Sequence, residues 1–241
     1  MTRRTLFTVF ACLVAFAILI GLGTWQMQRL HWKEGLIAEI QARTQAAAVS
    51  LPPKADWPGL DVADWEYRPV TLTGRFRNDE EAYVFTVLSE THGPYGGPGY
   101  WVLTPFDLHD GGTVIVNRGF VPETRRDPAT RKAGQIEGEV TIKGLLRAPE
   151  PRNMFTPDDE PAKRLFYARD AAPVAAAYSI ADAAPFTVDV ADSPEGGLPE
   201  GGESRISFPN NHFGYAMTWY GLAGGLALVL IGVLSRRRKP A

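Results

Sequence analysis

Two stretches of the chain lack charged residues over a length that could cross a membrane, one near each end. Residues 6–22 form an apolar run that continues through Gly23 and Thr24 to Trp25. Residues 213–234 contain no charged residue at all. At about 1.5 Å of rise per residue, a helix over 213–234 is about 33 Å long, and the hydrocarbon core of a bilayer is about 30 Å thick. The pattern therefore predicts transmembrane helices at 6–25 and 213–234.

Between these runs the hydrophobic pattern changes to short alternating segments. Strands are predicted where apolar residues recur at every second position, at 68–76, 82–88, 100–108, 113–121, 139–147, 165–169, 186–190 and 205–208. A single alanine-rich segment, 172–183, predicts a helix among them. Closely spaced strands with so little helix are typical of a mostly antiparallel β barrel or sandwich. The predicted fold is membrane-anchored α+β: a hairpin of two transmembrane helices around a β-rich domain at 26–209.

The first apolar run has two interpretations. A basic start and the small residues Gly21-Leu-Gly23 are typical of a cleaved signal peptide. However, the run is longer than the apolar core of most signal peptides, and Ala17, Gly21 and Thr24 form a small-residue face that could meet the glycines of the second apolar helix. These features favour a retained helix. Apolar and aromatic residues then recur at helical spacing to Ile40, so we expect an amphipathic extension over 26–43 that serves as an anchor.

Charge is distributed unevenly along the chain. Six of the 25 basic residues flank the apolar ends, in Arg3-Arg4 and in 236–239, which leaves 19 basic against 27 acidic residues, a net charge of −8, for the rest. An acidic middle part disfavours a nucleic-acid partner. Basic residues remain on the cytoplasmic side of a membrane, so we expect both termini there, with 235–241 as a basic tail and the β-rich domain on the other side.

One face of the second apolar helix carries small residues. With 100° between successive residues, Gly214, Thr218, Gly221, Gly225 and Gly232 fall within about 40° of one line. Small residues four apart allow a second helix to approach closely. We therefore predict that this stripe packs the two transmembrane helices together.

The opposite face carries His212, Ala216, Trp219 and Ala223, with Tyr215 to one side. An imidazole above two alanines and beside aromatic rings would suit a flat apolar ligand with a metal at its centre. The same histidine and rings could equally be interfacial anchors, which are common where helices leave a membrane. The pattern alone favours the anchors.

Motifs for most catalytic chemistries are missing. The single cysteine, Cys12, excludes an intramolecular disulfide and a paired-cysteine metal site. The sequence has no G-x-S-x-G, H-E-x-x-H or P-loop motif, so an anchored hydrolase has little support and we expect no enzyme activity. Arg118 could be a buried charge that binds a carboxylate or a propionate, but a structural salt bridge is the favoured interpretation.

Several short motifs follow one another along the chain: Gly21-Leu-Gly-Thr-Trp-Gln-Met-Gln-Arg29, Glu66-Tyr-Arg-Pro-Val70, Thr104-Pro-Phe106, Val116-Asn-Arg-Gly-Phe-Val-Pro122, Gly134-Gln-Ile-Glu-Gly-Glu-Val140, Tyr167 with Arg169-Asp170, and Asn211-His-x-x-Tyr-x-x-Thr-Trp-Tyr-Gly-Leu222. Read together and in this order, they resemble the Surfeit-locus family of cytochrome c oxidase assembly factors. The first and the last are the most specific, and together the motifs cover residues 21 to 222.

The resemblance implies a role in maturing haem–copper oxidase, near the step at which haem a enters the catalytic subunit. Some bacterial members are thought to bind haem a through the histidine that matches His212, so the expected binding residues are His212 as metal ligand, Tyr215 and Trp219. His31, near the same boundary, is the candidate second ligand. The implied partners are the catalytic subunit of cytochrome c oxidase, the haem a synthesis enzyme and membrane lipid.

The short segment before the first span favours a bacterial inner membrane with a periplasmic domain. The alternative function is a scaffold without a cofactor that stabilises an oxidase subunit during assembly.

Overall fold

The computed structural model describes residues 3–203 and 208–236 and divides the chain into two compact units. One unit contains residues 1–41 and 207–241, and we call its described part the helix pair. The other contains residues 42–206 and is called the β domain. Each unit is described by itself.

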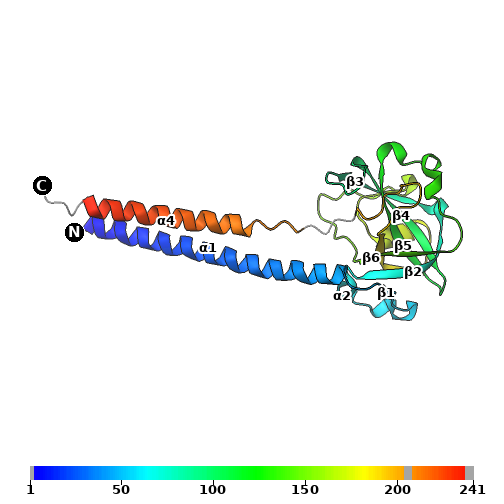
Figure 1. The fold of residues 1–241 in the computed structure, drawn as a ribbon, viewed down its shortest axis with the longest axis horizontal. Helices are drawn as coiled ribbons and strands as arrows, with labels where there is room; N and C mark the ends of the chain where they lie inside the picture. The colour runs from blue at the N-terminus through cyan, green and yellow to red at the C-terminus, as the bar shows by residue number, and fades with distance from the viewer. Residues whose placement is uncertain (1–2, 204–207, 237–241) are drawn as a thin grey trace. The chain divides into compact units, whose positions relative to one another are not determined.

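The helix pair consists of α4 (His212–Arg236) and of α1 (Arg3–Thr44) up to residue 41, and the two helices run side by side in Figure 1. Both are long and apolar enough, by length and composition, to cross a membrane. Large apolar side chains such as Phe7 (74% exposed) and Leu228 (72% exposed) cover their outer faces. That exposure is unfavourable in water and suits a lipid environment, so the two predicted spans stand as candidate membrane helices. α1 ends close to the predicted end of its extension at residue 43.

The least exposed residues of the pair recur at alternating spacings of four and three. On α1 they include Val9, Cys12, Phe16, Leu19, Gly23 and Gln26, and on α4 they include His212, Ala216, Trp219 and Ala223. This spacing is the heptad pattern by which two helices pack along one seam. The seam determines which polar side chains of α1 meet the beginning of α4.

The β domain contains a closed five-stranded barrel. Its strands, in barrel order, are β2 (Pro69–Phe76), β6 (Val140–Arg147), β8 (Ala183–Val190), β5 (Thr113–Pro122) and β4 (Gly97–Leu108). β4 pairs back with β2 through Gly74↔Leu108 and Phe76↔Phe106, which closes the sheet. All neighbours in the barrel are antiparallel except β5 and β8. The prediction of a mostly antiparallel barrel or sandwich is thus resolved in favour of the barrel.

Closure of the barrel depends on Gly74, where β2 pairs with both neighbours. Gly74 lies opposite Val140 of β6 and opposite Leu108 of β4. A Cβ at this position would lie 2.0 Å from the carbonyl oxygen of Asp107. Only glycine allows the two backbones to approach this closely.

Shorter elements extend the barrel. β3 (Ala82–Leu88) and β7 (Leu165–Phe166) continue the sheet beyond β4, and β1 (Val49–Ser50) lies parallel to β2. The remaining helical elements are α2 (Val62–Trp65), α3 (Ala171–Ala177), η1 (Lys54–Gly59), η2 (Asn78–Glu80), η3 (Glu123–Arg125), η4 (Pro128–Gly134) and η5 (Pro161–Lys163).

Apolar clusters lie on both faces of the sheet, as strand alternation requires. Val114 and Val116 of β5 point into the barrel with Phe186 and Val188 of β8. Ile115 points outward into a second core, which α3 covers. Residues of β8 that alternate with Phe186 and Val188 therefore lie on the outer face of the barrel.

The predicted strands agree with the observed ones most closely at 68–76, 82–88, 113–121 and 139–147. The helix predicted at 172–183 is shorter, because α3 ends before Tyr178, Ser179 adopts a left-handed conformation (φ 55°), and the chain enters β8 at Ala183. Most of the strand predicted at 205–208 lies outside the described residues, and Phe208 itself is not in a strand. Of the predicted basic tail at 235–241, only residues 235 and 236 are described, and they belong to α4.

Candidate functional site

The first residue of α4, His212, forms a hydrogen bond with α1. Its Nδ1 lies 2.7 Å from Oε1 of Gln26. A carbonyl oxygen can only accept a hydrogen bond, so Nδ1 carries the proton and donates it. In a neutral imidazole the other nitrogen, Nε2, then keeps its lone pair, which is the form that binds a metal. His212 is half-buried, so its ring is held in place without being enclosed.

Two further contacts fix the beginning of α4 against α1. The hydroxyl of Thr24 donates to the carbonyl of Ile20, so the hydroxyl of Tyr220 donates to Thr24 Oγ1 at 3.2 Å. Lys33 donates to the carbonyl oxygen of Pro209, just before α4. Both contacts lie near the His212–Gln26 bond and determine the register of the two helices.

The apolar surface of α4 that was predicted to hold a flat ligand is covered by α1. Ala216 is 0% exposed and Ala223 is 1% exposed, because both lie in the seam with α1. The expectation that a ligand would lie against these alanines is therefore wrong. Among the rings near His212, Phe213 and Tyr215 are exposed and Trp219 is half-buried. The Nε2 atom of His212 is able to bind a metal, and these rings are the open apolar side chains around it.

His31 lies on the far side of α1 from His212. Gln26 and Lys33 both face α4, as their contacts show. On a helix with 3.6 residues per turn, His31 is rotated by about 140° from Gln26 and by about 160° from Lys33. The structure therefore does not bring the two histidines together, and the suggestion of His31 as a second ligand to the same metal loses its support.

The glycine stripe of α4 does not pack against α1. A Cβ added at Gly214, Gly221, Gly225 or Gly232 would meet no atom within 4 Å. By contrast, a Cβ at Gly23 of α1 would lie 2.6 Å from the ring of Tyr220. The prediction that the stripe joins the two spans is wrong, because the close approach is made by Gly23 on the other helix. On α1, Thr24 contacts Tyr220 and not the glycine stripe, Gly21 is open and Ala17 is exposed.

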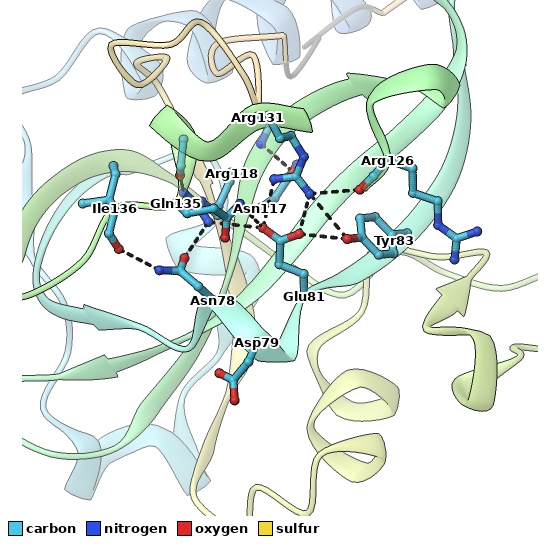
Figure 2. A network of polar contacts seen from close by, with 12 residues as sticks. Asn78, Asp79, Glu81, Tyr83, Asn117, Arg118, Arg126, Arg131, Gln135 and Ile136 are labelled. Atoms are coloured by element: carbon cyan, nitrogen blue, oxygen red, sulfur yellow. Dashed lines mark hydrogen bonds and ion pairs between the residues drawn. The ribbon is translucent and has the colours of Figure 1, made fainter. Parts of the chain in front are cut away.

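The β domain contains a buried polar network centred on Glu81, shown in Figure 2. The Glu81 carboxylate has no exposed surface. It accepts two hydrogen bonds from the Arg131 guanidinium, one from Gln135 at 2.9 Å and one from the Tyr83 hydroxyl at 2.9 Å. Arg118 also donates to it, at 3.4 Å. Both carboxylate oxygens are thus saturated with donors.

The remaining donors of Arg118 bind Asn78 and the carbonyl oxygen of Gly134. The network connects η2, β5 and η4, which lie apart in sequence (Figure 2). Arg118 therefore makes the structural salt bridge that the sequence favoured. Since Glu81 is sealed from solvent, its bonds hold these segments of the fold together.

Burial and ion pairing shift the pKa values of this network in opposite directions. Burial by itself raises the pKa of Glu81, but the hydrogen bonds and charge of Arg131 outweigh it and hold that pKa below the usual value. Burial lowers the pKa of Arg118 to about 10, although the Glu81 charge partly offsets it. Two guanidiniums share one carboxylate, so the network depends on Glu81 more than on any other member.

No group of three or more histidine, cysteine, aspartate or glutamate side chains could hold a metal ion within residues 3–203 and 208–236. His109 pairs with Glu139 at 2.9 Å, and His92 lies 3.5 Å from Glu203. A metal bound at His212 would therefore need ligands of its own, as the iron of a haem has.

Gln26 is the residue of this site that sequence reasoning missed. It lies in the motif at residues 21–29, but the sequence alone does not indicate a contact with His212. A polar residue three positions after Gly23, in the seam of an otherwise apolar helix, was the available signal.

Comparison with known proteins identifies the family. The sequence pattern of the SURF1 family matches residues 13–224. Human Surfeit locus protein 1 is 40% identical over 215 residues, covering 84% of this chain and 69% of the human protein. The mouse protein of that name is 37% identical over 238 residues, covering 92% of this chain and 74% of the relative. A SURF1-like protein of Monosiga brevicollis is 37% identical over 238 residues, covering 95% of this chain and 87% of the relative. The matched segment includes Gln26, His212 and all strands of the barrel, and the chain belongs to the SURF1 family.

Proposed function

We propose that this chain is an assembly factor for haem–copper cytochrome c oxidase that binds haem a through His212 and assists its insertion into the catalytic subunit. Membership of the SURF1 family and the two candidate membrane helices support the assembly role. The proposed partners are the catalytic subunit, the haem a synthesis enzyme and membrane lipid. No step of this role makes or breaks a covalent bond, so we propose a binding protein and not an enzyme.

The observation that carries the haem proposal is the hydrogen bond between His212 and Gln26. Gln26 holds the proton on Nδ1 and turns Nε2 away from α1, as hydrogen-bonded partners of metal-binding histidines do. When bound, the haem would supply an iron that accepts the Nε2 lone pair. The exposed rings of Phe213 and Tyr215 offer apolar contact on the open side of α4. Trp219 is less accessible, so we propose that it contributes less of the apolar contact with the haem.

The proposed location is the inner membrane of a bacterium. α1 begins with Arg3 and Arg4 at the end of the helix pair where α4 finishes, since His212 lies beside Gln26 and the helices are antiparallel. Basic residues at both chain ends then favour two cytoplasmic termini and a periplasmic β domain. His212 would lie at the periplasmic boundary.

The test is to purify the protein in detergent after co-expression with the haem a synthesis enzymes and to measure its absorbance spectrum. The wild type should carry haem a, and His212→Ala should lose it while protein level and membrane insertion stay normal. Gln26→Leu should weaken retention, because the proton on Nδ1 is no longer fixed. His31→Ala is the matched control, since it removes a histidine from the same boundary on the far side of α1, and it should leave the spectrum unchanged.

The second candidate function is a scaffold without a cofactor that stabilises an oxidase subunit. The open glycine stripe of α4 favours it, because a small-residue face that does not contact α1 is available to another transmembrane helix. A wild-type protein that carries no haem a but co-purifies with the catalytic subunit would support the scaffold. Normal haem a content in His212→Ala would remove the ligand assignment.

A further inference from the structure

A small polar pocket lies on the outer face of the barrel, where β6 ends beside β8. Its volume is about 240 Å³, and it is lined by Tyr67, Arg147, Glu150, Arg169, Thr187 and Asp189, among others. We call it the arginine pocket. All its residues belong to the β domain, and none takes part in the proposed haem site.

Strand alternation creates the pocket. Phe186 and Val188 of β8 point into the barrel, so Thr187 and Asp189 point outward. Arg147, the last residue of β6, is the register partner of Thr187. The pocket is therefore built on paired strands, whose positions are fixed by the barrel.

Two guanidiniums are held around one carboxylate. Arg147 donates to Asp189 Oδ2 at 3.0 Å and stacks over the ring of Tyr67 at 4.8 Å. Arg169 lies 3.5 Å from the same oxygen, with its guanidinium 5.7 Å from the ring of Trp101. Asp189 is buried and also accepts a hydrogen bond from Asn117 at 2.9 Å. At the floor two guanidiniums thus share the one buried carboxylate, while Glu150, 3.5 Å from Arg169, and Glu66, 3.8 Å from Arg147, bring the whole lining to three carboxylates against two guanidiniums.

Two buried polar atoms in the pocket have no hydrogen-bond partner. They are Nε of Arg147 and Oγ1 of Thr187. Thr187 is only 1% exposed. Buried polar groups in native proteins are almost always paired, so unpaired ones in a cavity suggest a missing partner. The carboxylate nearest to Arg147 Nε is that of Glu66, at 3.8 Å, which is beyond hydrogen-bonding distance.

The backbone is also strained at this pocket. Tyr67 is a non-glycine residue with φ 64°, in the left-handed region. Such strain is found preferentially at binding sites, where it fixes a side chain in a required position. Here it accompanies the stacking of the Tyr67 ring on Arg147.

We propose that the arginine pocket binds a carboxylate. Both unpaired groups can donate a hydrogen bond, and an ionised carboxylate only accepts. A planar carboxylate also matches the fork of a guanidinium. The rim carboxylates of Glu66 and Glu150 are more exposed than Asp189, and they disfavour a doubly charged anion such as phosphate. The small volume fits one carboxylate with a few carbon atoms, from a free acid or from the end of a peptide.

The experiment measures binding to the full-length protein in detergent by isothermal titration calorimetry at constant ionic strength. The probes are acetate and, as its neutral counterpart, acetamide. Acetate should bind with a saturable curve and acetamide should not. Acetyl-trialanine and its amide then distinguish the sources: tighter binding of the free peptide acid than of acetate assigns a peptide terminus, and equal or weaker binding assigns a free acid.

Thr187→Val is the decisive variant, because valine has nearly the same shape and removes only the hydroxyl. It should weaken acetate binding by about tenfold or more, as expected for a lost hydrogen bond to a charged group. It should not destabilise the fold, since the removed hydroxyl is unpaired. Thr104→Val is the matched control: Thr104 is 0% exposed with an unpaired hydroxyl but does not line the arginine pocket.

Three results would overturn the proposal. The first is the absence of saturable acetate binding by the wild type, which would mean that the pocket holds only water. The second is equal binding of acetamide, because the charge would then play no part. The third is unchanged acetate binding in Thr187→Val, or an equal loss of binding in Thr104→Val, since either result would show that acetate binds outside the arginine pocket.

Discussion

Replacing Glu81 with glutamine tests how the β domain is held together. Glu81 is completely buried and is the only carboxylate that the structure places beside the guanidiniums of Arg118 and Arg131 among the described residues. The substitution keeps the size of the side chain and removes its charge. Its amide nitrogen is also a donor, placed where Arg131 and Tyr83 both donate. The variant therefore has two buried cations without a counter-charge and a clash of donors.

The expected loss of stability is large. Breaking a buried ion pair by removing one partner costs about 3–5 kcal/mol, because the other charge stays buried and unpaired. For a domain of this size 1 kcal/mol shifts the melting temperature by about 2–4 °C, so a decrease of about 6–20 °C follows. Burial alone would raise the pKa of Glu81, but the Arg131 hydrogen bonds and charge outweigh it, so this pKa is lowered in the fold. A lowered carboxyl pKa contributes stability above its unfolded value and loses it as the pH falls through the folded value. Glu81→Gln should therefore be less sensitive to acid than the wild type.

Thermal unfolding of the full chain in detergent, followed by near-ultraviolet circular dichroism, measures the effect. Glu139→Gln is the matched control, because Glu139 is also paired, with His109, but on the surface. It should leave the melting temperature unchanged, as exposed pairs contribute little. If Glu81→Gln melts within 2 °C of the wild type, a shift of roughly what 1 kcal/mol would cause, the network does not stabilise the domain in the way described.

Two further predictions concern single contacts. Gly23→Leu should separate α1 from α4, because its Cβ alone would lie 2.6 Å from the Tyr220 ring, and overpacking costs about 1–3 kcal/mol; Gly225→Leu, whose Cβ meets nothing within 4 Å, should be neutral. Crosslinking between cysteines introduced at the two ends of the seam checks this, and equal crosslinking in both variants would contradict it. The pKa of His109 should lie above its ordinary value, because Glu139 accepts its hydrogen bond and stabilises the charged ring. The ion pair then exists between the lowered pKa of Glu139 and the raised pKa of His109, and it is lost as the pH rises through the latter; titration by nuclear magnetic resonance should show a lower His109 pKa in Glu139→Gln.

The elements of the fold could be predicted where the pattern is local. Alternation over 82–88 and 113–121 gave β3 and β5 almost residue for residue, and the charge-free run gave α4. Closure of the barrel could not be predicted, because it depends on Gly74 lying beside Asp107, a contact between residues 33 positions apart in the chain. No period in the sequence marks such a contact.

The candidate sites were predictable only in part for the same reason. His212 is selected through the family resemblance, because the helix pattern alone favours an interfacial anchor, and its role as a ligand stays a prediction. The arginine pocket could not be predicted, since Tyr67, Arg147, Arg169 and Thr187 are scattered over more than a hundred residues and each is ordinary in its own segment. The barrel register alone places Arg147 opposite Thr187.

The helix pair shows why a correct motif can be given the wrong partner. Gly221 and Gly225 have the spacing that permits close helix packing, yet the seam passes through Ala216 and Ala223. Small residues permit an approach from any helix, whereas the contacts of Gln26 with His212 and of Thr24 with Tyr220 are possible in one orientation only. A polar group in an apolar seam loses free energy when it has no hydrogen-bond partner, so these contacts determine which face of α4 is turned toward α1. The glycine face is then directed away from α1, and in a membrane it is the face that a second protein could reach.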